Sequence, residues 1–266
     1  MKLLTLNTHS LMEAEYERKL RVLTEAIIKH RPFIISLQEV MQPFDCKKSR
    51  YPCDNCGKIS LKEGNHALNI AKALEKLGAK YYLTWLGFKK SYGKFDEGLA
   101  ILSEIKPKQS EAILLSPFDN YENWKTRKAL GIKINNYWYY NVHIGWWNDV
   151  ESPAKEEIKR LFNAQPKSEQ AFLMGDFNCS ACEMDKGYDY IKKCGYYDTF
   201  CLAKNKDSGI TAYTDIDGWD KKDEKKEIRI DYIFSNKEIE VESSFVIFNG
   251  SNEERVSDHN GIILTL

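Results

Sequence analysis

Short apolar runs separated by polar breaks recur along the chain and predict most of its secondary structure. Runs of roughly four to eight apolar residues bounded by turn residues are typical of buried β-strands. The Asn135-Asn136 pair between two of these runs favours the tight turn of a β-hairpin. The predicted strands cover residues 2–6, 33–37, 97–102, 129–134, 137–142, 171–175, 228–234, 245–248 and 262–266.

Apolar residues at helical spacing predict three helices between these strands. The first helix follows the opening strand and stops at Pro32, because proline cannot continue a helix. The second begins at the N-cap residue Asn65 and ends at Gly78. The third begins with Ser152 as its cap and Pro153 as its first helical residue.

The mixture of hairpins and crossover helices predicts an α/β fold. Strands outnumber helices, and neither an internal repeat nor a linker interrupts the sequence. We therefore predict one domain, residues 1–266, built as a four-layered sandwich of two stacked mixed β-sheets flanked by helices. Residues 42–63 are polar and cysteine-rich and predict a long functional loop. The charge run 221–227 predicts a solvated turn.

Polar residues lie next to several of the predicted strands. Asp176 and Asn178 come directly after the apolar run 171–174, and Asp258 and His259 come just before the last strand. Carboxylate and amide oxygens are hard ligands that suit Mg²⁺ or Mn²⁺, and histidines beside carboxylates suit acid–base work. Metal-assisted attack on a phosphorus centre is therefore predicted. The full set is Asn7, Glu39, Glu97, His143, Asp176, Asn178, Asp231, Asp258 and His259.

The composition is that of a globular protein without a charge imbalance. The chain has 266 residues, of which 42% are hydrophobic and 12% aromatic, and 39 basic residues balance 39 acidic ones. Non-specific nucleic-acid binders usually have a basic excess, so a small phosphorylated substrate is favoured over nucleic acid. The apolar runs are too short to span a membrane or to form a signal peptide. We therefore expect a cytoplasmic protein with no membrane partner.

Seven short motifs carry a resemblance that covers essentially the whole chain. They are the opening strand with Asn7, Leu37-Gln38-Glu39-Val40, Asp96-Glu97-Gly98, Asn141-Val142-His143, Gly175-Asp176-Phe177-Asn178, Arg229-Ile230-Asp231-Tyr232-Ile233 and Ser257-Asp258-His259. In this order they resemble the endonuclease/exonuclease/phosphatase superfamily. Residues 96–103 and 143–149 further resemble the bacterial branch that includes maltose 6'-phosphate phosphatase.

The resemblance implies a metal centre and an attacking water. Glu39 is implied as the central Mg²⁺ ligand, with Asn7 and Asp258 close to the metal or its waters. Asp176 and Asn178 are implied to align the attacking water and a phosphoryl oxygen. Mn²⁺ is an alternative ion for the same oxygen ligands.

The same resemblance implies roles for His143 and His259. Asp231 is implied to orient His259 and fix its tautomer, and either His259 or Asp176 then acts as the base. His143 is implied to pair with Glu97 on the leaving-group side. Some branches have an acid two residues after the opening asparagine, where this chain has His9, so a second metal is not implied here.

Three further residues are candidates for substrate binding. The Arg127 guanidinium can clamp a phosphoryl oxygen, although it could also be an ordinary surface arginine. Trp146 and Trp147 follow His143 closely and can stack on a sugar ring, although they could equally be core or lid packing. We predict Mg²⁺-dependent hydrolysis of a phosphate monoester, a sugar phosphate such as maltose 6'-phosphate. The alternative is an endonuclease or another phosphodiesterase of the same superfamily.

Two C-x-x-C pairs form a separate motif. Cys53 and Cys56 lie in the long loop after Glu39, and Cys179 and Cys182 follow Asn178. Paired C-x-x-C motifs are typical of structural zinc sites, so four thiolates could hold Zn²⁺ over the active site. Free thiols in a reduced loop are the alternative, and a redox or catalytic thiol is a third.

Overall fold

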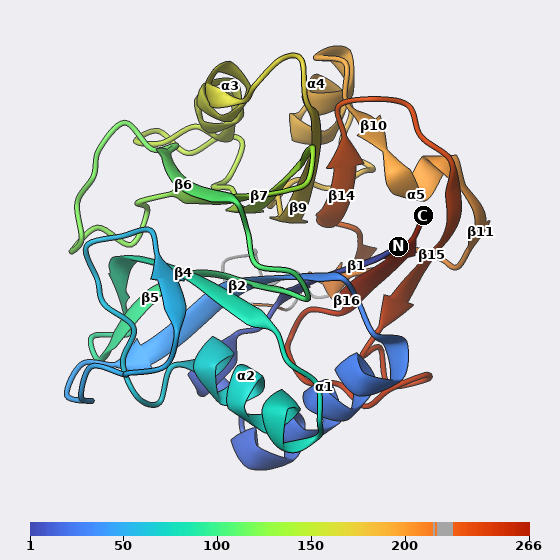
Figure 1. Cartoon of the computed structure of the whole chain (residues 1–266). Helices are drawn as coiled ribbons and strands as arrows, with labels where there is room; N and C mark the ends of the chain where they lie inside the picture. The colour runs from blue at the N-terminus through green and yellow to red at the C-terminus, as the bar shows by residue number, and fades with distance from the viewer. Residues whose placement is uncertain (215, 217–225) are drawn as a thin grey trace.

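Two β-sheets stacked face to face form the centre of the structure, with helices on the outer face of each sheet (Figure 1). The computed structural model describes residues 1–214, 216 and 226–266. Within these residues one sheet has eight strands and the other has six. This arrangement confirms the predicted four-layered α/β sandwich of mixed sheets.

The eight-stranded sheet brings the first and last strands of the chain together at its centre. β1 pairs parallel with β2 on one side and antiparallel with β16 on the other, and Figure 1 shows the two termini side by side. In spatial order the strands are β11 (Ala203–Lys206), β15 (Val241–Ile247), β16 (Gly261–Thr265), β1 (Lys2–Asn7), β2 (Ile34–Pro43), β5 (Phe95–Ser103), β4 (Tyr82–Ser91) and β3 (Cys53–Asn55).

The six-stranded sheet is antiparallel except for one central pair. β8 and β9 run parallel, so both strands end at the same edge of the sheet. In spatial order its strands are β10 (Tyr197–Asp198), β14 (Asp231–Ser235), β9 (Gln170–Asp176), β8 (Tyr137–His143), β7 (Lys128–Ile134) and β6 (Gln109–Leu114). β12 (Ala212–Tyr213) and β13 (Glu227–Ile228) form a small separate ribbon.

Apolar side chains fill the space between each pair of layers. The core between the two sheets includes Leu3 and Ile101 from one sheet and Ile132 and Phe172 from the other. Each such side chain contributes roughly 1.5–3 kcal/mol when fully buried. The helices α1 (Tyr16–His30) and α2 (His66–Lys76) cover the eight-stranded sheet, and α3 (Ala154–Ala164) and α4 (Gly187–Lys193) cover the six-stranded sheet.

Short elements complete the chain between the layers. η1 (Ser10–Met12) follows β1, and α5 (Thr199–Leu202) links β10 to β11. In the part of the chain that the structure describes, no helix has the length and apolarity needed to cross a bilayer.

Two predicted signals at element ends are confirmed and one is wrong. The Asn65 side chain accepts a hydrogen bond from the Leu68 amide at the start of α2, and β7 and β8 form the predicted hairpin. At α3, however, Pro153 occupies the cap position. The Ser152 hydroxyl donates to the buried Glu157 carboxylate instead, because the backbone turns into the helix one residue later than predicted.

Strands were missed where the sequence alternates weakly. β4 and β6 were not predicted, and β3 lies inside the segment predicted as a loop. The strand predicted over 228–234 is divided, because residues 229–230 separate β13 from β14. The predicted solvated turn lies mostly outside the described residues.

Candidate active site

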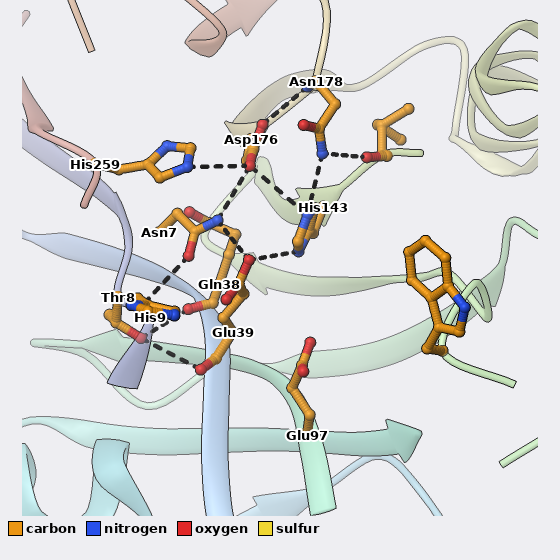
Figure 2. A network of polar contacts seen from close by, with 12 residues as sticks. Asn7, Thr8, His9, Gln38, Glu39, Glu97, His143, Asp176, Asn178 and His259 are labelled. Carbon is orange, nitrogen blue, oxygen red and sulfur yellow. Dashed lines mark hydrogen bonds and ion pairs between the residues drawn. The ribbon is translucent and has the colours of Figure 1, made fainter. Parts of the chain in front are cut away.

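The ends of parallel strands from both sheets supply the polar residues of one site. β8 and β9 end in register at His143 and Asp176, and β1 and β2 run parallel with Asn7 opposite Gln38. Because parallel strands end at a common edge, the polar residues that follow them gather there. Figure 2 shows the resulting network of side chains.

Asn7 links the two sheets at the centre of this network. Its amide nitrogen donates to Glu39 Oε1 at 3.0 Å and to Asp176 Oδ2 at 3.0 Å. Its amide oxygen accepts a hydrogen bond from the His9 backbone amide. Asn7 therefore fixes the positions of two carboxylates beside the predicted metal position.

Two of the site residues have a strained backbone conformation that sets the direction of their side chains. Glu39 lies in a β-bulge, where the pairing of β2 with β5 shifts register, and has a φ of 51°. Asn178 has a φ of 46°, and its amide donates to Asp176 Oδ1 at 2.8 Å. A left-handed conformation in a residue other than glycine costs free energy and is common at functional sites. A bulge also redirects the side chain that it carries.

Asp231 holds His259 against Asp176. The Asp231 carboxylate accepts from His259 Nδ1 at 3.0 Å, which leaves Nε2 3.9 Å from Asp176 Oδ2. Burial disfavours the charged form of His259, but attraction from Asp231, Asp176 and Asp258 outweighs it and raises the pKa of His259 well above its usual value. These carboxylates therefore favour the protonated form of His259, whose ring faces Asp176.

Asp176 has the properties of a base that works near neutral pH. Burial and the neighbouring Asp231 charge raise the pKa of Asp176 to about 7, although His259 and two hydrogen bonds oppose the rise. A general base is most effective when its pKa lies near the working pH. Burial, together with the positive charges of Arg127 and Lys89, lowers the pKa of His143.

The predicted pairing of Glu97 with His143 is wrong. The Glu97 carboxylate forms an ion pair with Lys89 Nζ at 2.9 Å. His143 Nε2 instead lies 3.2 Å from the Asn178 amide nitrogen, and His143 Nδ1 lies 4.0 Å from Glu39 Oε1. The reason is that Lys89 on β4 stands directly opposite Glu97 on β5.

Arg127 is buried with part of its guanidinium unpaired. Its side chain is 2% exposed, so it is not a surface arginine. Its Nε and Nη1 atoms have no hydrogen-bond partner, and the guanidinium lies 5.9 Å from the Trp146 ring centroid. Buried unpaired donors are costly. Arg127 also lines the adjoining cavity, where an anionic ligand would offset its buried positive charge.

A cavity of about 310 Å³ joins these groups. Its floor includes Glu39, Asp176 and His259, and Trp124 and Trp146 meet edge to face at its rim with ring centroids 5.7 Å apart. The cavity is lined by His9, Glu39, Lys89, Lys90, Ser91, Tyr92, Glu97, Trp124, Arg127, His143, Trp146, Asp176, Asn178, Asp258 and His259.

Trp147 does not contribute to this cavity, so its predicted role in substrate binding is wrong. It packs against the core beneath α3 and α4, with its ring 5.9 Å from that of Tyr190. Trp146 therefore lines the cavity, whereas the adjacent Trp147 belongs to the helix-covered core. Trp124, from a loop of the six-stranded sheet, replaces Trp147 as the partner of Trp146.

The four cysteines of the predicted zinc site do not come together, so that hypothesis is wrong. Cys179 is buried beneath α3 and α4, whereas Cys53 packs on the core beneath α1 and α2. Cys56 packs on the core between the sheets, and Cys182 is exposed. Among the described residues, no metal-compatible group of three or more side chains contains a cysteine. The pairs fail to meet because they belong to different layers.

The carboxylates near Glu39 fit a divalent cation. Burial raises the pKa of Glu39, and repulsion from Glu97 and Asp258 raises it further. A cation beside Glu39 and Asp258 would offset this repulsion. Oxygen donors of this kind suit Mg²⁺ or Mn²⁺. In the described part of the chain, two groups of three side chains hold their ligand atoms within 4.8 Å of one another: Asp176 with Asp231 and His259, and Asp258 with His9 and Glu13. In the group with Asp258, the Glu13 carboxylate already pairs with His9 and Lys19.

Lys89 is the main site residue that sequence reasoning missed. It lies on β4, which was not predicted as a strand, and a register shift after Gly87 turns it toward Glu97. A lysine within a polar and aromatic stretch carries no motif. The alternation of residues around 86–91 is the only signal that could have revealed a strand there.

Comparison with known proteins decides the family. Residues 4–259 match the family described as endonuclease/exonuclease/phosphatase. The chain belongs to the endonuclease/exonuclease/phosphatase family. Enzymes of this family hydrolyse phosphoesters and typically use divalent metal ions, so the protein is a phosphoester hydrolase. A comparison with curated protein sequences found no match.

Solved structures of this family share the fold. An endonuclease/exonuclease/phosphatase family protein from Leptotrichia buccalis is 32% identical, with a TM-score of 0.89 over 100% of this chain and 98% of that one. A mannosyl-6-phosphatase from Bacteroides thetaiotaomicron is 16% identical, with a TM-score of 0.63 over 99% and 98%. D. rerio TDP2 complexed with a single-strand DNA product is 14% identical, with a TM-score of 0.63 over 99% and 97%.

Proposed function

We propose that this protein hydrolyses a phosphate monoester, a sugar phosphate such as maltose 6'-phosphate, with the help of a bound Mg²⁺ or Mn²⁺. The observation that carries the proposal is the buried Arg127, which lines the cavity beside Asp176 and has guanidinium nitrogens without a hydrogen-bond partner in the protein. A terminal phosphoryl group carries close to two negative charges at neutral pH. It would pair with Arg127 through the planar fork that suits phosphate oxygens.

The walls of the cavity favour a sugar as the rest of the substrate. Trp124 and Trp146 form an aromatic rim, and Tyr92 also lines the cavity. Aromatic faces with polar neighbours suit a sugar ring. A volume of about 310 Å³ is enough for a small ligand rather than a polymer. Likeness to the mannosyl-6-phosphatase agrees with this choice but shows only a common fold.

Each side chain would have a defined task in the reaction. Asp176 would take the proton of the attacking water, because its pKa of about 7 suits a base. The His259 imidazolium would donate to a phosphoryl oxygen, held there by Asp231. Asn178 would orient the phosphoryl group from the His143 side.

The metal would be held by Glu39 and Asp258, with Asn7 keeping Glu39 in position. When bound, a divalent cation neutralises charge on phosphoryl and leaving oxygens. The choice of Asp176 as base and His259 as phosphate ligand is supported by the Asp231–His259 contact and by the raised pKa of His259, which favours its charged form.

The direct test is a phosphate-release panel of hexose and disaccharide phosphates, with plasmid nicking measured in parallel. The wild-type protein should release phosphate from at least one sugar phosphate in Mg²⁺ and leave the plasmid intact. Asp176→Asn should lose about 10²–10⁴-fold in kcat, the usual contribution of a general base. Its thermal midpoint in EDTA should be no lower than that of the wild type, because the substitution removes a buried charge beside Asp231.

Plasmid nicking without phosphate release would contradict the proposed phosphatase activity and favour the nuclease alternative. Undiminished turnover in the Asp176→Asn variant would refute the role of Asp176. Both assays use the same purified proteins, and the thermal midpoints show that each variant is folded.

A further inference from the structure

Lys89 and Glu97 form a buried ion pair inside the cavity. The Lys89 and Glu97 side chains are only 6% and 7% exposed, and Lys89 Nζ lies 2.9 Å from Glu97 Oε1. Lys89 Nζ also donates to the Trp124 carbonyl at 3.2 Å. An ammonium group has three donors, so two are accounted for by the protein. Both residues line the cavity together with Asp176.

The backbone is shaped to bring this pair into the site. β4 shifts register between Gly87 and Lys89, which leaves Phe88 as the extra residue and places Lys89 opposite Glu97. Bulges are common next to active sites, where they redirect a side chain. Two β-bulges, at Glu39 and before Lys89, therefore aim charged groups at the same cavity.

The pair stands on the far side of Glu39 from Asp176. In Figure 2 Glu97 and Asp176 lie on opposite sides of the Glu39 carboxylate. In phosphoryl transfer the attacking and leaving oxygens are roughly in line on opposite sides of phosphorus. If Asp176 activates the water, the leaving oxygen faces the side of Glu97 and Lys89.

We propose that Lys89 is the catalytic residue that protonates the leaving oxygen of the phosphate monoester, and that Glu97 positions it. This inference rests on the proposed function, because it assigns the second half of the same reaction. It replaces the implied Glu97–His143 pair, which the structure does not form. Burial and the nearby Arg127 charge lower the pKa of Lys89, although Glu97 opposes this, so the ammonium is a readier proton donor than an exposed lysine.

The step balances without a further reactant. Water attacks phosphorus and gives one proton to Asp176, while the bond between phosphorus and the bridging oxygen breaks. The bridging oxygen keeps the electron pair of that bond and takes a proton from the Lys89 ammonium. The products are the free sugar, with its hydroxyl group restored, and inorganic phosphate. The proton on Asp176 then returns through solvent to neutral Lys89.

Leaving-group dependence tests this role. An alkoxide leaving group such as that of glucose 6-phosphate needs a proton, whereas p-nitrophenolate leaves as a stable anion. Lys89→Met should lower kcat on glucose 6-phosphate by about 10²-fold or more, the scale of general acid catalysis, but by less than about 10-fold on p-nitrophenyl phosphate. Glu97→Gln should show the same selectivity with a smaller loss.

Matched variants separate chemistry from folding. Lys133→Met removes a strand lysine that is also paired with a carboxylate, Glu169 at 2.6 Å, but outside the cavity. It should keep wild-type rates on both esters. Lys89→Arg keeps the charge but holds its proton too tightly to transfer, so it should rescue binding of glucose 6-phosphate without restoring kcat.

The outcomes are distinct. Equal losses on both esters in Lys89→Met, or full kcat in Lys89→Arg, would overturn the role of Lys89 as proton donor. No phosphate release by the wild type from any sugar phosphate of the panel or from p-nitrophenyl phosphate would defeat the proposed function, and the inference with it. Circular dichroism and thermal midpoints confirm that each variant is folded before rates are compared.

Discussion

Trp146 and Trp147 are adjacent in sequence but belong to different parts of the molecule. Trp146 meets Trp124 at the rim of the cavity, and Trp147 packs under the helices beside Tyr190. The first side chain therefore affects ligand binding, and the second affects packing. Two neighbouring substitutions should separate these effects.

Trp146→Ala should raise KM for a sugar phosphate by roughly 10-fold, since stacking on an aromatic ring contributes about 1–3 kcal/mol. Trp147→Ala should instead lower the free energy of unfolding by roughly 2–4 kcal/mol, because it opens a cavity under α3 and α4. Steady-state kinetics and urea unfolding measure the two effects. A rise in KM for Trp147→Ala with unchanged stability would contradict this division.

Single residues show what local sequence could and could not predict. Asp176, Asn178, Asp258 and His259 were found because each lies in a short motif next to an apolar strand. The direction in which the side chain of a loop residue points was not predictable from the sequence. Cys179 follows the left-handed Asn178 and is turned into the helix-covered core, and no spacing rule reports such a turn.

At the scale of elements, strand register decides which residues meet. The buried strands were predicted because their apolar runs are continuous. β4 was missed because charged and aromatic residues interrupt its pattern, and the Lys89–Glu97 pair depends on how β4 and β5 align. Cross-strand partners are set by tertiary pairing, so this contact could not be derived from either strand alone.

The start of α2 contains a histidine that couples stability to pH. His66 is buried, and its Nδ1 faces the Tyr16 hydroxyl at 2.9 Å, which joins α2 to α1. Burial lowers the pKa of His66 from 6.5 to about 4. The unfolded chain therefore binds more protons than the folded chain between these two pH values.

The contribution of His66 to the free energy of unfolding should be fully present above pH 6.5. It should be lost as the pH drops toward 4, which lowers this free energy by up to about 3 kcal/mol. His66→Gln should flatten this part of the pH dependence, because glutamine does not titrate. Urea unfolding at pH 7.5 and pH 5 measures the difference. An equal loss of stability in the variant and the wild type would exclude His66 as the cause.

At the scale of the whole molecule, the site depends on both sheets being stacked. Glu39 comes from the eight-stranded sheet and Asp176 from the six-stranded sheet, and Asn7 bonds to both. The layered architecture was predictable from the order of strands and helices and from the family motifs. The exact neighbours across the two sheets were not, since they depend on how the sheets stack.

A ligand that binds only the folded chain should stabilise the entire fold. Mg²⁺ at 100 times its Kd would add about 2.7 kcal/mol to the free energy of unfolding, which corresponds to roughly 5 °C or more in Tm. Glu39→Gln should lose most of this shift and most of the activity, and EDTA should abolish wild-type turnover. Thermal melts with and without Mg²⁺, at matched ionic strength, measure the shift in Tm. Equal shifts in both proteins would place the cation elsewhere.

The pairing of β1 with β16 has a consequence for how the protein comes to be active. The Ser257 hydroxyl donates to the Asn7 carbonyl across 250 residues of sequence, and Asp258 and His259 follow at once. Contacts of such high contact order form late, because loop closure must precede them. A folding chain therefore lacks β16 and the Asp258 and His259 groups of the site until residues 257–265 have paired with β1, so hydrolytic activity depends on this long-range contact.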